Sequence, residues 1–375
     1  MKAGLEVHQQ LATGKLFCRC PGTLTEQVDR TVLRRLRATG GESAAIDPAV
    51  AFEAARGIQF RYETTPSSCL VEADEEPPKE LDPAALDVAL TVALLLHARP
   101  VDEIQVMRKI VIDGSNTSGF QRTSLVATNG WIELKGKRIG IPTVCLEEDA
   151  ARKVGEGNGE SRFRLDRLGI PLVEVATAPE IASGTEAKEL AEEIGLLLRA
   201  TRRVRRGIGT IREDLNVSVE GGTRVEIKGV QELRLLPKYV DSERERQETL
   251  LHIRDRLVSA HASAPVDPAR PLTDLLDGVR EGPFRMLGHG GVAWGLRLPG
   301  FAGLLRSPEN SSERLGRELA DYARTTGVKG LLHSDELPVH GLEGPRLLRV
   351  RERLGAEERD GFVVVVAPSV ATAEA

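Results

Sequence analysis

Three stretches of the chain repeat hydrophobic residues at the spacing of an α-helix. The first covers residues 83–98 (PAALDVALTVALLLHA), where Asp82 suits the N-cap and Pro83 suits the first turn. The second covers about residues 183–202, and the third covers about residues 241–261 with the charge density of an exposed helix. The pattern therefore predicts a helix in each of these stretches, and the clearest strand signal lies between the last two.

Residues 210–228 alternate between apolar and polar positions, as a β-hairpin does. One face of the first strand carries Ile211, Leu215, Val217 and Val219, and the other face carries Thr210, Arg212, Asp214, Asn216 and Ser218. A turn at residues 220–222 (EGG) leads to a second strand, in which Arg224, Glu226 and Lys228 continue the polar face. This polar face either meets water, as in many antiparallel sheets, or binds a ligand.

Three short apolar segments carry acidic residues where a buried strand would favour hydrophobic ones. They are residues 4–11 (GLEVHQQL), 143–154 (TVCLEEDAARKV) and 169–181 (GIPLVEVATAPEI). In the first, Glu6 and His8 are two residues apart, so on a strand they share a face. Carboxylates among apolar neighbours need compensation, and a hard divalent cation such as Mg²⁺, held by oxygens and one imidazole, would supply it.

Simpler interpretations of these segments remain open. Glu6 and His8 can belong to a hydrogen-bonded strand surface, and the acids at 147–149 can begin a helix that continues through AARKV. The three segments point to one site only if they meet in space.

The length of 375 residues predicts two or three domains. Residues 263–274 (SAPVDPARPLTD) are rich in proline and alanine and predict a linker. After it, the pattern predicts a strand at 291–301, a capped helix within 309–330 and a buried strand at 360–368, which together form a small mixed α/β module.

Charge and cysteine content narrow the class of protein. A formal charge of −5 argues against a uniformly basic nucleic-acid-binding surface. The 4 cysteines are too few and too irregular for a disulfide framework, and no signal peptide or apolar run of membrane length is evident, so we expect a cytoplasmic protein without a membrane partner. Cys18 and Cys20 lack the spacing of a zinc knuckle and no second pair follows, so structural zinc is not expected, and Cys69 and Cys145 are expected to pack.

Residues 108–123 (RKIVIDGSNTSGFQRT) join two basic residues to a loop of glycine, serine, threonine and asparagine. Backbone amides and hydroxyls in such loops can bind phosphate. The chain has neither GxxxxGK[ST] nor GxGxxG after a strand, so a nucleotide site would be of another kind.

Longer motifs resemble a known family. The chain resembles the E subunits of archaeal glutamyl-tRNA(Gln) amidotransferases in eight segments. These are GLEVHQQL, KLFCRCP, SSCLVEADEEPP, VMRKIVIDGSNTSGFQRT, VCLEEDAARKV, GIPLVEVATAPEI and RRGIGTIREDLNVSV with RVEIKGVQEL. Bacterial B subunits are similar over the same motifs, but SCLVEADEEPP and SNTSGFQRT favour the archaeal form. The segment from about Arg270 onward resembles an insert shared with bacterial-type aspartyl-tRNA synthetases.

The resemblance implies an α+β fold. Residues 1–265 would form a mixed, cradle-like catalytic domain of antiparallel sheets with helices, and residues 266–375 a small α/β insert domain. The family's C-terminal helical and tail domains are expected to be absent from this chain.

The resemblance also implies an activity. The subunit would use ATP and Mg²⁺ to phosphorylate the γ-carboxylate of glutamate attached to tRNA(Gln). Ammonia from a partner amidohydrolase, the asparaginase-like D subunit, would then displace phosphate and give glutaminyl-tRNA within a hetero-oligomer. Phosphoryl transfer of this kind depends on positioning and on neutralisation of charge.

By the same resemblance, the expected metal ligands are Glu6, His8, Glu174 and one of the adjacent pair Glu147 and Glu148. Of this pair, Glu148 is favoured. The expected catalytic residues are Glu6, His8, Glu148 and Glu174. Expected contacts to ATP or the aminoacyl end come from Arg108, Lys109, Ser118, Arg212, Asp214, Asn216, Glu226 and Lys228. Three other functions compete with this one: a non-catalytic tRNA-binding scaffold, a bacterial-type B subunit with a different glutaminase, and a metal-dependent hydrolase that does not use ATP.

Overall fold

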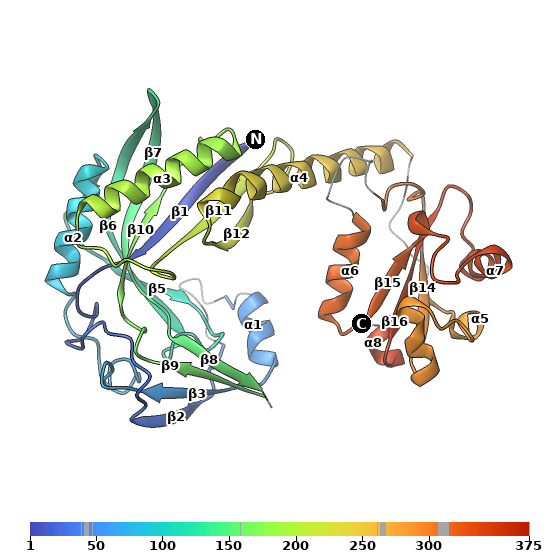
Figure 1. Cartoon of the computed structure of the whole chain (residues 1–375), viewed down its shortest axis with the longest axis horizontal. Coiled ribbons are helices and arrows are strands. Elements are labelled where there is room, and N and C mark those ends of the chain that lie inside the picture. Colours follow the sequence, from blue (N-terminus) through green and yellow to red (C-terminus); the bar gives the residue numbers. More distant parts are fainter. Residues whose placement is uncertain are drawn as a thin grey trace. The chain divides into compact units, whose positions relative to one another are not determined.

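The computed structural model describes residues 1–38, 40, 45, 46, 48–157, 159–260, 262, 268–306 and 315–374 (Figure 1). The chain forms two compact units. The first contains Met1–Ser218 and Arg224–Val240, and the second contains Val219–Thr223 and Asp241–Ala375. Each unit has its own sheet and hydrophobic core.

An eight-stranded antiparallel sheet dominates the first unit. Along its main path the order is β12 (Val225–Val230), β11 (Ile211–Ser218), β1 (Lys2–Gln10), β10 (Pro171–Ala176), β7 (Lys137–Glu148), β6 (Phe120–Leu134) and β4 (Arg99–Pro100), and β5 (Val106–Ile110) also pairs with β6. In Figure 1 the blue strand β1 runs between β10 and β11. The N-terminal strand is therefore central in the sheet.

Two helices pack against this sheet, α2 (Pro83–Leu95) and α3 (Gly184–Ala200). Asp82 accepts a hydrogen bond from the Ala85 amide at 3.1 Å and caps α2. Ser183 accepts one from the Glu186 amide at 3.1 Å and caps α3. Both helices predicted from the sequence are confirmed, because their capping residues and apolar stripes act together.

The predicted hairpin is also confirmed as β11 and β12, with Leu215 paired to Ile227 and Val217 to Val225. A short 3₁₀ turn, η1 (Leu233–Leu235), leads into α4 (Leu236–Ser259). This helix begins five residues earlier than the charge pattern indicated, because Leu236 is buried and Pro237 fits the first helical turn.

A four-stranded sheet completes the first unit. Its order is β2 (Arg30–Arg34), β3 (Gln59–Thr64), β9 (Glu160–Arg164) and β8 (Arg152–Gly157), with α1 (Pro48–Ala55) before β3, and the pair β3–β9 is parallel. The alternative of a helix running through AARKV is wrong, because β7 extends to Glu148 and Arg152 already begins β8.

The second unit has a four-stranded antiparallel sheet with helices around it. The strand order is β13 (Arg270–Pro271), β14 (Val292–Leu298), β16 (Gly361–Ala367) and β15 (Gly330–His333). The helical elements are α5 (Thr273–Leu276), η2 (Gly282–His289), α6 (Leu315–Thr325), η3 (Ser334–Glu336), α7 (Gly344–Leu354) and α8 (Val370–Glu374). The two predicted strands and the helix are confirmed, whereas residues 263–267 of the predicted linker and residues 309–314 before the helix lie outside the described residues.

The fold is thus a mixed α+β arrangement built mainly on antiparallel sheets, as expected. Within the part of the chain that the structure describes, we find no helix with the length and apolar content needed to cross a bilayer.

Candidate active site

One face of the eight-stranded sheet is polar across neighbouring strands. The strand register sets this face, because His8 lies opposite Glu174 on one side and Arg212 on the other, and residues paired across strands project to the same side. The polar face, as we call it, carries Glu226 and Lys228 on β12, Arg212, Asp214 and Asn216 on β11, Glu6 and His8 on β1, Glu174 on β10, Glu147 on β7, Gln121 and Thr123 on β6, and Lys109 on β5.

A buried cluster of His8, Glu147 and Glu174 lies at the centre of this face. The Nε2 atom of His8 is 3.5 Å from an oxygen of Glu147 and 3.5 Å from an oxygen of Glu174. The side chain of Lys109 reaches the same two carboxylates, at 3.1 Å from Glu174 Oε2 and in a short contact with Glu147. The three residues are nearly inaccessible to solvent, and each offers an atom that could bind the same cation.

The electrostatics of the cluster are those of two crowded carboxylates. Burial, and then the charge of Glu174, raise the pKa of Glu147. Burial opposes ionisation of Glu174 as well, but its hydrogen bonds with His8 and Glu147 and the charge of Lys109 lower its pKa overall. Burial also opposes the charge of Lys109, but the two glutamates outweigh it and raise the pKa of the amine. The cluster therefore holds negative charge, which the amine of Lys109 partly offsets.

A second acidic cluster, Glu6 with Asp214 and Glu226, lies beside the first on the polar face. Asn216 donates to Glu6 Oε1 at 2.9 Å, and the amide of Gly229 donates to Asp214 Oδ1 at 2.7 Å. The exposed amine of Lys228 is 3.6 Å from Asp214 Oδ2 and also contacts Glu226. Glu6 therefore shares a strand face with His8 but has its own set of partners.

The structure brings together most, though not all, of the residues expected in the metal site. Glu147 belongs to the cluster with His8 and Glu174, whereas the adjacent Glu148 points to the other side of the strand and accepts from Arg122 Nη1 at 3.0 Å. Consecutive residues of a strand project to opposite faces, so only one of the two glutamates can join the polar face. The geometry therefore favours Glu147 over Glu148, which the resemblance had favoured, and we place Glu147 in the candidate site.

Two of the expected ATP contacts lie elsewhere. The guanidinium of Arg108 is 5.6 Å from the ring centre of Phe120, and adjacent residues of β5 project oppositely, so it does not share the face of Lys109. The hydroxyl of Ser118 donates to the backbone carbonyl of Phe120 at 3.0 Å. Arg212 does lie on the polar face, where its guanidinium is 3.4 Å from Asp149 Oδ1. The loop before β6 thus uses its Ser118 hydroxyl internally.

Two further residues of the cluster were not predicted from the sequence. Thr123 donates to Glu147 Oε1 at 2.9 Å, and Gln121 Nε2 is 3.4 Å from Glu147 Oε2. Both lie in the FQRT segment that begins β6, and their alternation with Arg122 was the available signal. They fix the position of Glu147, whose own sequence context did not distinguish it from Glu148.

The donor set is suited to a hard divalent cation. His8, Glu147 and Glu174 offer one imidazole and two carboxylates, and Glu6, Asp214 and Glu226 offer oxygens alone. Repulsion between Glu147 and Glu174 raises the free energy of the cluster as it stands, and a cation between them would relieve it. The chemistry of the residues therefore fits Mg²⁺.

Comparisons with known proteins identify the family of the chain. The family model described as the GatB/GatE catalytic domain matches residues 1–327. Among similar proteins are the glutamyl-tRNA(Gln) amidotransferase subunits E of Sulfurisphaera tokodaii (47% identical over 98% of this chain and 60% of the relative), Methanopyrus kandleri (49%, over 98% and 59%) and Archaeoglobus fulgidus (46%, over 99% and 60%).

The chain thus spans 59–60% of the length of these relatives. The family match covers the whole of the eight-stranded sheet and its polar face. On the strength of this match, the chain belongs to the GatB/GatE catalytic-domain family.

Proposed function

We propose that the polar face binds ATP with Mg²⁺ and that the chain phosphorylates the γ-carboxylate of glutamate attached to tRNA(Gln), as one half of an amidotransferase reaction. The observation that carries this proposal is the buried cluster of His8, Glu147 and Glu174 with Lys109 on the polar face of the sheet, in a chain of the GatB/GatE family. Phosphoryl transfer needs a metal cation and positive side chains placed around phosphate oxygens. This face offers ligands that could hold such a cation, together with the amines of Lys109 and Lys228.

The residues have distinct roles in this proposal. His8, Glu147 and Glu174 would hold Mg²⁺, with Glu6 beside them. When bound, the ion would neutralise charge on the transferred phosphoryl group. Lys109, whose side chain is 50% exposed, and Lys228, which is 70% exposed, can contact phosphate oxygens from the two sides of the face. Four further residues of the polar face would position the nucleotide or the aminoacyl end, namely Arg212, Asp214, Asn216 and Glu226.

The rest of the pathway follows from the chemistry of an acyl phosphate. Water competes for such an intermediate, so ammonia must reach it directly, and we propose a partner amidohydrolase of the asparaginase-like kind within a hetero-oligomer. The relatives are named as subunits, which supports this assembly. Because its substrates are ATP and aminoacyl-tRNA, we place the protein in the cytoplasm. We also propose that residues 1–265 form the catalytic cradle and that residues 266–375 correspond to the insert shared with aspartyl-tRNA synthetases.

The function can be tested with free ammonium in place of the partner. The purified chain is mixed with Glu-tRNA(Gln), ATP, Mg²⁺ and ammonium chloride, and Gln-tRNA(Gln) and ADP are measured. We expect both products, and we expect Glu147→Gln and Glu174→Gln to lower their rate of formation by at least about 100-fold, because each removes a charge that holds the cation.

Glu133→Gln is the matched control, since Glu133 is an exposed carboxylate on β6 away from the polar face. It should react as the unmodified chain does. Binding of Mg²⁺–ATP, measured by calorimetry, separates the alternatives. Nucleotide binding without ADP formation would favour a tRNA-binding scaffold, and Mg²⁺ binding without any nucleotide binding would favour a hydrolase; either result would contradict the proposal.

A further inference from the structure

Positive charge is concentrated at the end of α3 and in the loop that follows it. Residues 199–209 (RATRRVRRGIG) contain five arginines and no acidic residue, whereas the whole chain has a formal charge of −5. Two of these arginines serve the fold itself. Arg203 pairs with Asp87, and Arg205 Nε donates to the Leu11 carbonyl at 2.9 Å. We call residues 199–209 the arginine loop.

The other three arginines are exposed and unpaired. The guanidinium groups of Arg199, Arg202 and Arg206 make no hydrogen bond or ion pair with any residue that the structure describes. Arg202 follows the C-cap of α3 with a φ of +58°, a backbone conformation in which glycine is favoured. The stability of the helix end therefore does not explain an arginine at this position.

The arginine loop follows a defined path along the end of β1. Leu11, just after β1, forms an antiparallel bridge with Val204. The side-chain amide of Gln9, a residue that is 3% exposed, donates to the carbonyls of Arg205 at 3.1 Å and Thr210 at 2.9 Å. A buried side chain thus fixes the backbone from which the arginines project.

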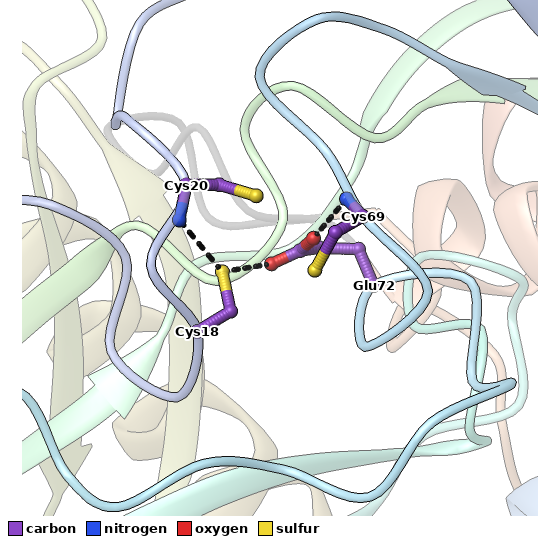
Figure 2. Close-up of side chains that lie close together, drawn as sticks. All are labelled: Cys18, Cys20, Cys69 and Glu72. Carbon is purple, nitrogen blue, oxygen red and sulfur yellow. Dashed lines mark hydrogen bonds between the residues drawn. The ribbon is translucent and has the colours of Figure 1, made fainter.

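The segment after β1, against which the arginine loop lies, is itself well fixed. Cys18 Sγ donates to Glu72 Oε1 at 2.8 Å, and the Cys69 amide donates to the other oxygen of Glu72 at 2.7 Å (Figure 2). The Lys15 amide donates to the Cys20 carbonyl at 3.1 Å and closes the turn between them. The arginine loop therefore rests on an ordered part of the first unit.

The arginine loop also lies next to the polar face. Leu11, the partner of Val204, follows His8 by three residues, which is about 10 Å along an extended strand. At its other end the loop leads into β11, where Arg212 lies opposite His8. Positive charge therefore extends from the arginine loop to the buried cluster of the polar face.

We propose that the arginine loop binds the phosphates of the single-stranded 3′ end of the aminoacyl-tRNA. This inference rests on the proposed function, which brings the aminoacyl group to the polar face. Guanidinium groups match phosphate oxygens in geometry and charge. Arginines spread along an extended segment fit the repeated phosphates of an RNA strand better than the compact triphosphate of ATP. The separation from His8 suits the last few nucleotides before the aminoacyl ester.

Ile208 offers a contact for a base within the same loop. Its relative exposure is 102%, and it lies between Gly207 and Gly209, whose φ values are +117° and +81°. Apolar side chains of this kind pack against unstacked bases in other nucleic-acid-binding proteins. The arginines would supply most of the affinity without regard to sequence, and Ile208 would hold one unpaired base.

The test is the binding of a labelled RNA hairpin that copies the acceptor stem of tRNA(Gln) with its single-stranded 3′ end, measured by fluorescence anisotropy at several salt concentrations. The unmodified chain should bind it more tightly than the same hairpin without the unpaired nucleotides. Arg202→Gln with Arg206→Gln should weaken binding at least about 10-fold at low salt. The slope of log K against log salt should fall by about 1.4, because each phosphate contact to a single strand contributes about 0.7.

Ile208→Ser should weaken binding by about 5-fold without changing the salt slope, because it removes an apolar contact and no charge. Arg285→Gln with Arg349→Gln is the matched control, since both are exposed arginines of the second unit and the net charge changes equally. This control should bind the hairpin as the unmodified chain does. Equal binding of the two hairpins, or an equal loss in the control, would overturn the proposal.

The inference and the proposed function can fail separately, because the binding of the hairpin is measured without ATP. Hairpin binding that depends on Arg202 and Arg206, without ADP formation, would contradict the proposed function and leave the arginine loop an RNA-binding surface. ADP formation together with unchanged hairpin binding in the double variant would contradict this inference alone. In turnover, the double variant should raise the KM for Glu-tRNA(Gln) by about 10-fold and leave calorimetric binding of Mg²⁺–ATP unchanged.

Discussion

The two faces of the eight-stranded sheet use the same strands for opposite purposes. On β1, Leu5 and Val7 are at most 1% exposed and belong to the large core, whereas Glu6 and His8 alternate with them on the polar face. The apolar face gains free energy from burial, while on the polar face the burial of Glu147 beside the charge of Glu174 opposes folding. Alternation along a strand therefore allows one element to supply stability on one side and chemistry on the other.

Glu213 departs from this division. It lies opposite Val7 and therefore on the apolar side of β11, where it is 4% exposed and its Oε2 atom has no hydrogen-bond partner among the described residues. Burial alone raises the pKa of Glu213 to about 7. The alternation of the hairpin predicted apolar residues at the neighbouring positions of this face. Glu213 therefore places a carboxyl group on the side of β11 that otherwise supplies hydrophobic burial.

The difference between the two faces is tested most severely by a charge placed on the apolar side of β10. Val175 is fully buried, and Val175→Asp would leave an unpaired carboxylate among hydrophobic side chains. We expect the free energy of unfolding to fall by more than about 4 kcal/mol, measured by urea denaturation. Glu174→Gln, one residue away on the polar face, should lower the midpoint much less, although it removes a carboxylate whose ionised form the fold stabilises. Equal midpoints for both variants would contradict the division between the faces.

The buried carboxyl of Glu213 should make the free energy of unfolding depend on pH. Its folded-state pKa of about 7 lies above the ordinary value of 4.5, so the carboxyl destabilises the fold increasingly as pH rises from 4.5 through 7. Glu213→Gln removes this titration. The variant should therefore gain about 3 kcal/mol relative to the unmodified chain between pH 4.5 and pH values above 7. Unfolding series at several pH values would measure this, and a difference that does not change with pH would exclude a raised pKa.

Replacement of Glu147 on the polar face should change the free energy of unfolding least. Burial and the charge of Glu174 raise the pKa of Glu147, so its ionised form costs stability at neutral pH. Glu147→Gln should raise the free energy of unfolding by about 1 kcal/mol there, with the gain vanishing as pH falls toward the ordinary range of glutamate. The measurement requires chelator, because bound Mg²⁺ would reverse the sign. A loss of stability in chelator would mean that Lys109 and His8 already offset the charge fully.

Local patterns predicted much of this fold. Asp82 and Ser183 indicated two helices because capping is a property of adjacent residues, and the hairpin followed from strict alternation. The pairing of His8 with Glu174 could only be hypothesised from the sequence, since it depends on which strands become neighbours.

The remaining features depend on register and on tertiary closure. The choice between Glu147 and Glu148 is set by how β7 aligns with β10 and β6, which no local window contains. Cys18 and Cys20 lack a second pair nearby in sequence, but the folded chain brings Glu72 to Cys18 across a separation of 54 residues, and Cys69 lies beside them. The expectation that Cys69 simply packs therefore missed a contact that only the folded chain creates.

The polar face is carried by strands and not by loops, and this has a dynamic consequence. Backbone amides in the middle of an eight-stranded sheet exchange with solvent only when large parts of the unit open, so His8 and Glu174 are held at a fixed spacing on the timescale of catalysis. A substrate bound there, as we propose, must then adapt to a rigid surface, and any motion that encloses it has to come from the segments around the edge of the sheet.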